Sequence, residues 1–357
     1  MRKNKEINQK AHINIKFEKF NIQKIIPIFI LVYVFYYFKK WNIKKILIEV
    51  DLSIIKSQGG GPVQLQRGIS KILPYETQYC KFFPVDSINI TNLTKNIDYF
   101  YISYPNINEK SYNECLFKNK ANTLILGPSF VPNNWFHFPD LKYWKERKFK
   151  EILREIKAVA VQSIRVRDHI ALKSNSKDLL KKFIISRSCT YIIPNEIKIF
   201  KERSIDIILY LKYADSNREK EGLQLFNLLK NTNKKIHILK YGYFKKNDLI
   251  YLASNSKFII YFSFYDCGPI ALKEIQNYGV IIFSHQKEFI ISDKTGYYIP
   301  ELENKNLTYA FNKIMKIIND LSKKNPDTRN IAQINQDINK CENTLDDLCN
   351  GIVNSYK

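Results

Sequence analysis

The sequence has few acidic side chains relative to its basic ones. It also lacks the cysteine and histidine spacings that are typical of metal sites. Against 57 lysines and arginines it has 34 aspartates and glutamates, which gives a formal net charge of +23. None of its six cysteines forms a Cys-x-x-Cys pair, and its five histidines do not lie at ligand spacing. We therefore expect no structural zinc site, no disulfide framework and a reducing compartment.

The excess of positive charge favours anionic partners, such as phosphates, nucleic acid or an acidic membrane surface. Much of it is lysine scattered among asparagine and isoleucine, so a functional positive field and a simple composition bias both stay open. The sequence has no helix-turn-helix, RNA-binding aromatic signature or zinc knuckle, so we expect no nucleic-acid partner. Hydrophobic residues make up 45% of the chain, which excludes global disorder.

The basic segment 1–43 contains the apolar run IIPIFILVYVFYYF at 25–38, which is 14 residues long. As a helix this run spans about 21 Å, which is less than the roughly 30 Å of a bilayer's hydrocarbon core. Aromatic residues at its end resemble an interfacial belt, and no small-residue cleavage site follows. Three interpretations stay open: a short membrane anchor, a helix packed on the globular part, and an uncleaved signal-like segment. We expect a cytoplasmic location, with membrane association if 25–38 is an anchor.

After residue 43, short apolar runs alternate with helical patterns, which is typical of parallel sheets covered by helices. The alternation occurs in two series, with a boundary near 195–204. It predicts an α/β fold with two Rossmann-like domains, at 44–200 and 201–335, followed by a helical tail at 336–357. The expected strands lie at 44–51, 99–103, 123–126, 158–163, 205–211, 235–240, 258–262 and 280–284, and the expected helices at 63–73, 148–157, 218–230 and 246–254.

A glycine loop, Gly59-Gly60-Gly61, separates the first expected strand from the first expected helix. A strand, a glycine loop and a helix together form a phosphate-holding unit, because free backbone N–H groups and the helix dipole point at the loop. The loop is not a dinucleotide fingerprint, since the third glycine of that motif falls on Gln64, and no Walker sequence follows. A tight turn without a ligand is the alternative interpretation.

The stretch YDCGPIALKE follows the expected strand 258–262 and carries two carboxylates eight residues apart, Asp266 and Glu274. Asp266 lies on a turn with Gly268, and the N–H groups of Ile270 and Ala271 are unpaired donors at the start of a helix. From within that helix, Glu274 can accept two hydrogen bonds from a vicinal diol such as a ribose. An acidic helix cap and a solvated glutamate are the alternative.

Several motifs resemble those of the GT-B glycosyltransferases in the large retaining group called family 4. The second carboxylate stands at the spacing of that group's Glu-x7-Glu signature, and the segments around the signature also match. The matching segments are Ser263-Phe264-Tyr265-Asp266, Tyr278-Gly279-Val280-Ile281-Ile282, Glu288-Phe289-Ile290-Ile291 with Thr295-Gly296, Ile193-Pro194-Asn195, and the glycine loop.

The resemblance implies two Rossmann-like domains that face each other across a cleft. It implies a metal-independent hexosyltransferase that moves a sugar, with retention, from a nucleotide-diphosphate sugar to a glycan or lipid-linked acceptor. No cofactor is implied beyond the donor, and the sequence contains no Asp-x-Asp metal motif. The alternatives are a nucleotide-sugar epimerase or hydrolase of the same fold, and a sugar-nucleotide-binding protein without transferase activity.

The resemblance also assigns roles to particular residues. It implies that Glu274 holds the ribose and that Asp266 orients hydroxyls of the sugar. Lys212, with Lys220 or Arg218, then neutralises charge on the departing diphosphate. The N-terminal catalytic histidine of the family has one candidate here, His137, in an aromatic loop. The sequence departs from the family at Asp266, where a glutamate is usual, at Pro269, where a glycine is usual, and at Glu221, which interrupts the family's Lys-Gly pair.

Overall fold

The structure is a computed structural model of the whole chain, in which residues 44–357 form one compact unit. It describes the ranges 43–50, 61–86, 97–102, 124–127, 157–168, 178–212, 216–263, 269–303 and 306–354. Within these ranges, no helix combines the length and the apolar character needed to cross a bilayer. The apolar run 25–38 lies outside the described residues, as does the expected helix at 148–157 except for its last residue.

The first sheet has seven strands in the order β2-β3-β1-β4-β5-β6-β7. All of its pairs are parallel except β2 with β3. Helix α3 (Gly61–Ile72) follows β1, as the glycine loop predicted. The strands are β1 (Lys44–Val50), β2 (Tyr75–Glu76), β3 (Cys80–Asp86), β4 (Tyr99–Ile102), β5 (Leu124–Leu126), β6 (Ala158–Val161) and β7 (Phe183–Ile185).

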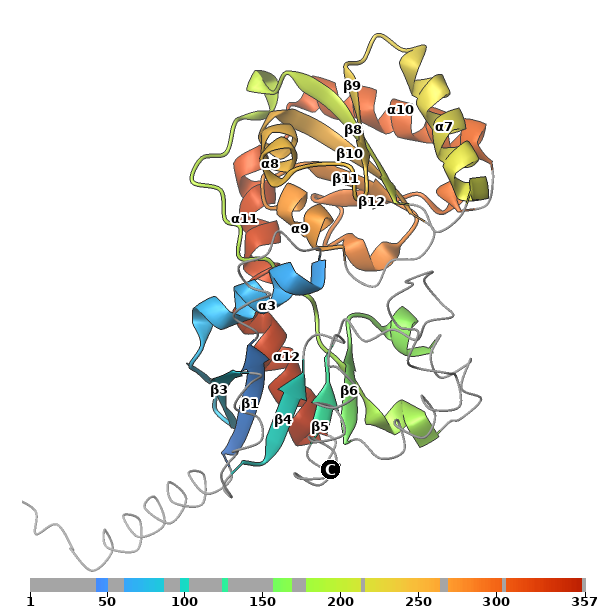
Figure 1. Cartoon of the computed structure of the whole chain (residues 1–357). Helices are drawn as coiled ribbons and strands as arrows, with labels where there is room; N and C mark the ends of the chain where they lie inside the picture. The colour runs from blue at the N-terminus through green and yellow to red at the C-terminus, as the bar shows by residue number, and fades with distance from the viewer. Residues whose placement is uncertain are drawn as a thin grey trace, which may run out of the picture. The chain divides into compact units, whose positions relative to one another are not determined.

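The second sheet has five parallel strands in the order β12-β11-β10-β8-β9 (Figure 1). Its strands are β8 (Ile205–Lys212), β9 (Ile236–Lys240), β10 (Ser256–Ser263), β11 (Ile281–Ser284) and β12 (Gly296–Tyr298). The helices that follow β8 are α7 (Ser216–Lys230), α8 (Lys246–Asn255), α9 (Ile270–Gln276), α10 (Leu307–Lys324), α11 (Thr328–Ile338) and α12 (Cys341–Asn354). The α/β fold with two largely parallel sheets is confirmed.

Both faces of the second sheet are buried, which explains why β8 and β10 are almost continuously apolar. In β8, Ile207 and Leu209 belong to the core beneath α7 and α10, whereas Ile208 and Tyr210 belong to the core beneath α8 and α9 (Figure 1). Alternate residues of a strand point to opposite faces, so a strand covered on both sides has no polar positions to alternate with.

The last helix, α12, packs on the first sheet rather than on the second. Leu345, Leu348 and Ile352 of α12 are buried in the same cluster as Ile46 and Ile48 of β1. Figure 1 shows α12 in red beside the blue and green strands, and α12 contacts both α3 and β7. The first core is therefore built from segments at both ends of the described chain.

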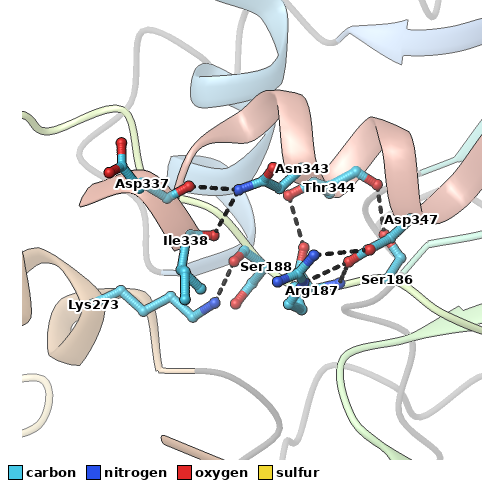
Figure 2. Close-up of polar contacts among 9 residues, drawn as sticks. All are labelled: Ser186, Arg187, Ser188, Lys273, Asp337, Ile338, Asn343, Thr344 and Asp347. Carbon is cyan, nitrogen blue, oxygen red and sulfur yellow. Dashed lines mark hydrogen bonds and ion pairs between the residues drawn. The ribbon is translucent and has the colours of Figure 1, made fainter. Parts of the chain in front are cut away.

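The segment between the two sheets, 186–199, begins with polar contacts to α12 (Figure 2). The Ser186 hydroxyl donates to the Thr344 carbonyl at 3.0 Å, and the Thr344 hydroxyl donates to the Arg187 carbonyl at 2.7 Å. The Arg187 guanidinium donates two hydrogen bonds to Asp347, at 2.7 and 3.0 Å. These contacts fix the first residues of the connecting segment against the helix.

The expectation of no disulfide framework is wrong. Cys80 of β3 is bonded to Cys349, and Cys189 of the connecting segment is bonded to Cys341, so both bridges end on α12. The partners are 269 and 152 residues apart in sequence, so no local spacing signals them. The cytoplasmic location stays a prediction, and the bridges weigh against it because disulfides persist mainly in oxidising compartments.

Removing the Cys80–Cys349 bridge should destabilise the fold by roughly 2–5 kcal/mol, because the bridge closes a long loop in the unfolded chain. The measurement is equilibrium denaturation of the oxidised protein and of a Cys80→Ala, Cys349→Ala double variant. Thiol titration in denaturant provides the control, since two bridges among six cysteines leave at most two free thiols. Six titratable thiols in the oxidised protein would contradict the pairing.

Candidate functional site

The strands of the second sheet end on one edge, where the chain turns into the connecting loops. Lys212 ends β8 and Ser263 ends β10, and the two residues are register partners across the parallel pair. The Lys212 ammonium lies over the Tyr241 ring, 4.6 Å from its centroid, just after β9. Ligands of open α/β sheets bind outside the carboxyl ends of the strands. This edge is therefore the candidate site.

Glu274 lies on α9, the helix that follows β10, and its carboxylate is buried with 4% of the residue exposed. It forms an ion pair with Lys246, the first residue of α8. Burial raises the pKa of Glu274, while the charge of Lys246 and hydrogen bonds from Lys246 and Thr190 act in the opposite direction. The solvated-glutamate alternative is thus wrong, because the carboxylate lies inside the protein and has a basic partner.

Sequence reasoning did not identify Lys246 as part of this site. The residue lies beyond the loop after β9, whereas Glu274 lies beyond the loop after β10. The available signal was topological, because loops that follow parallel strands of one sheet all begin at the same edge.

The start of α9 approaches the helix of the glycine loop. Ile270 is buried in the same cluster as Leu65 and Ile69 of α3, and the two helices are in contact. The first backbone bonds of α9 run from the N–H groups of Leu272 and Lys273 to the carbonyl of Pro269. Ala271 is half-buried at the same turn.

Two further contacts join the sheets near the same edge. Arg165, which follows β6, lies 3.8 Å from Glu288 and 4.0 Å from Glu303. Glu288 follows β11, and Glu303 follows β12. The carboxyl end of one strand of the first sheet is therefore close to the carboxyl ends of two strands of the second.

Arg218 is buried in α7 and is engaged by the protein. Its guanidinium donates to Glu221 at 2.7 Å, to the Leu302 carbonyl at 2.8 Å and to the Ser263 carbonyl at 3.3 Å. It also lies over the Phe262 ring, 3.9 Å from the centroid. These contacts connect α7 to Ser263 at the end of β10 and to Leu302 in the segment that follows β12.

The remaining predicted site residues are spread over the chain. Lys220 is exposed on α7, and Gly61 is the first residue of α3. Gly59, Gly60, His137, Asp266 and Gly268 lie outside the described residues. Among the residues with described positions, no group of three or more histidines, cysteines, aspartates or glutamates is arranged to hold a metal ion.

Lys273, next to Glu274 on α9, contacts the segment between the sheets. Its ammonium donates to the Ser188 carbonyl, as Figure 2 shows. The pKa of Lys273 is lowered to about 7, mainly by burial and also by the charge of Arg187, while the charge of Asp347 acts in the opposite direction. One helix therefore presents both the candidate carboxylate and a contact to the connecting segment.

No protein-family model matches the chain, and a search of curated proteins gave no match. Among solved structures, the chain is similar to a mutant of S. aureus TarM in complex with fondaparinux, alpha-GlcNAc-glycerol and UDP. The identity is 13% and the TM-score 0.46, over 80% of this chain and 58% of TarM. The chain thus spans little more than half of TarM.

Two further similar structures are matched over nearly their full length. Sucrose-phosphate synthase from Thermosynechococcus elongatus is 11% identical, with a TM-score of 0.49, over 88% of this chain and 98% of the other. UDP-GlcNAc 2-epimerase from Neisseria meningitidis, bound to UDP-GlcNAc, is 9% identical, with a TM-score of 0.44, over 87% and 99%. With identities this low and TM-scores below 0.5, these similarities establish neither the family nor the activity of this chain. The fold class is established by the two largely parallel sheets described above.

The Lys273→Met variant should reveal a pH-dependent contribution to stability. Between pH 7 and about 10 the unfolded chain holds a proton on this amine that the folded chain has released, so wild-type stability rises with pH. Below pH 7 both states hold the proton and the contribution is constant. The wild-type free energy of unfolding minus that of the variant should grow by about 1–3 kcal/mol from pH 7 to 10, because partial exposure reduces the full effect.

Urea denaturation at several pH values measures this difference. Lys230→Met, at the exposed end of α7, controls for the loss of a lysine. A difference between wild type and Lys273→Met that stays flat over the interval would contradict the assignment.

Proposed function

We propose that the chain is a glycosyltransferase that moves a sugar from a nucleotide-diphosphate sugar to a glycan or lipid-linked acceptor, with retention and without a metal. The supporting observation is the buried Glu274 carboxylate, paired with the partly exposed Lys246, at the carboxyl edge of a fully parallel sheet. A carboxylate kept in a buried position beside a lysine is typical of functional sites, although structural ion pairs also occur. Contacts from α3 and Arg165 bring the first sheet to the same edge, where an acceptor can meet the donor.

In this proposal, the bond between the anomeric carbon and the diphosphate oxygen breaks, and the diphosphate leaves with the electron pair. The acceptor hydroxyl forms the new bond from the same side, and its proton passes to the departing diphosphate. Lys212 neutralises the charge that develops on the leaving group, which lowers the barrier more than it strengthens ground-state binding. Arg218 is left out of this role because its guanidinium is bound to Glu221 and to backbone carbonyls.

Donor binding then requires an exchange of partners at Glu274. The ribose hydroxyls donate to the carboxylate, which holds Lys246 and Thr190 when no donor is bound. Lys246 is about one-third exposed, so it can turn toward solvent or toward the donor diphosphate. Asp266 orients hydroxyls of the sugar, and the amide groups at the start of α3 contribute donors toward the diphosphate.

A second candidate is a sugar-nucleotide-binding protein without transfer activity. The observation that favours it is the same ion pair, since Lys246 already occupies the carboxylate that would hold the ribose. The two candidates differ in turnover. Both bind nucleotide sugars, but only the first releases nucleoside diphosphate in step with glycosylated acceptor.

Glu274→Gln should weaken nucleotide binding by about 10- to 100-fold, because a charge-assisted hydrogen bond to the ribose is lost. The measurement is titration calorimetry with a panel of nucleoside diphosphates and their sugar conjugates. Asp206→Asn is the matched control, since Asp206 pairs with Lys257 at 2.9 Å at the opposite edge of the same sheet. Equal affinities for wild type and Glu274→Gln would show that Glu274 does not contact the nucleotide. A wild-type chain that binds no compound of the panel would refute the proposed function.

Lys212→Ala should lower kcat by about 10²-fold while KM for the donor changes little, since the lysine acts on charge that develops during bond cleavage. Steady-state kinetics with the donor found in the panel tests this split. Lys230→Ala, at the far end of α7, is the control for losing a positive charge. An increase in KM with kcat unchanged would assign Lys212 to ground-state binding instead.

A further inference from the structure

A second buried polar cluster lies at the carboxyl edge of the second sheet, at the ends of β10 and β11. It consists of Ser263, Ser284, His285 and Gln286, all of them 3% exposed or less. The roles proposed above for Lys212 and Glu274 do not use these side chains. Polar side chains this deeply buried normally have all of their hydrogen-bonding groups matched.

The amide of Gln286 is held at one end and lacks a partner at the other. Its Nε2 donates to the Ser263 hydroxyl at 2.7 Å and lies 3.4 Å from Nε2 of His285. The backbone N–H of Gln286 donates to the Ser284 hydroxyl at 3.0 Å, which fixes the turn after β11. Its Oε1 is shielded from solvent and has no hydrogen-bond partner within the described part of the chain. Turning the amide over exchanges the two atoms but still leaves one end unmatched.

The position of this amide relates it to the candidate donor site. Ser263, which holds the amide, is the register partner of Lys212 on the neighbouring strand. Lys212 is the residue proposed to meet the leaving diphosphate. The unmatched amide thus follows β11, with only β10 between that strand and the one that ends at Lys212, on the edge where ligands of parallel sheets bind.

The chemistry of the unmatched group restricts what it can recognise. In the orientation described, the unmatched end is a neutral carbonyl oxygen, whose partner must carry a hydrogen, as a hydroxyl does and an ionised phosphate does not. A hydroxyl also fits the reversed amide, because it can accept from the N–H group, so of these two groups only a hydroxyl fits both orientations. Because the acceptor is shielded from solvent, a ligand whose hydroxyl donates to it binds much more tightly than an analogue that lacks the hydroxyl. Two parts of a nucleotide-diphosphate sugar combine hydroxyls with proximity to the diphosphate, namely the ribose and the transferred sugar. The ribose is assigned above to Glu274, which leaves the transferred sugar for Gln286.

We propose that Gln286 is a specificity residue that accepts a hydrogen bond from a hydroxyl of the transferred sugar, with Ser263 holding its amide in place. The inference rests on the proposed function, because it assumes a nucleotide-diphosphate sugar at this edge. It assigns recognition of the sugar to the turn after β11, separately from recognition of the nucleotide by Glu274.

The test compares the affinities of the full chain for a nucleoside diphosphate and for its sugar conjugate, using the pair that wild type binds best in the panel. Gln286→Met should bind the conjugate about tenfold more weakly and the free diphosphate within about twofold of wild type. Deoxy-sugar conjugates add a second readout. The conjugate that lacks the recognised hydroxyl should bind wild type and Gln286→Met equally well.

Gln276→Met is the matched control. Gln276 is also buried in this part of the fold, but its Nε2 donates to the Phe289 carbonyl at 2.8 Å, so its amide already has a protein partner. This variant should change both affinities in parallel or not at all. If Gln286→Met does not unfold cooperatively, Ser263→Ala takes its place, with the same selective loss expected to a smaller degree.

An equal loss for the conjugate and the free diphosphate, or no loss for either, would overturn the assignment of Gln286 while leaving the proposed function intact. The assignment of Gln286 would also be overturned if wild type bound the sugar conjugate no more tightly than the free diphosphate. A wild-type chain that binds no nucleotide at all would refute the proposed function and this inference together.

Discussion

The parallel arrangement of the second sheet is the constraint from which the candidate site follows. With all five strands running the same way, every carboxyl end lies on one edge. This arrangement is stable only because helices cover both faces, so the apolar runs of β8 and β10 have no exposed side. Lys212 ends β8, Glu274 lies on the helix after β10 and Gln286 follows β11, yet all three lie near the same edge because the strands share one direction.

Much of the second half was predictable from sequence, because its long apolar strands alternate with helices at ordinary lengths. β8, β9, β10 and β11 lie within two residues of their expected limits. β3 escaped prediction because Lys81 and Pro84 interrupt its apolar run, and β7 and β12 are only three residues long. The fold class depended on the long elements, so these omissions did not change it.

The site was predictable only in part, because its contacts join residues that are distant in the chain. The spacing of motifs led to Glu274 as a candidate, but its ion-pair partner Lys246 lies on another helix, and hydropathy does not report such pairs. The same limitation explains the cysteines. A pattern read along the chain gives no distance between β3 and α12, whose cysteines come together only when the last helix packs on the first sheet.

That packing has a consequence for biosynthesis. The core of the first sheet includes Leu345, Leu348 and Ile352, which the ribosome adds after the whole second sheet. Amino-terminal domains usually fold while the rest of a protein is still being made. Here the earlier-made half stays incomplete until translation has passed the later one, so a chain stalled before α12 would expose an apolar surface to chaperones and proteases.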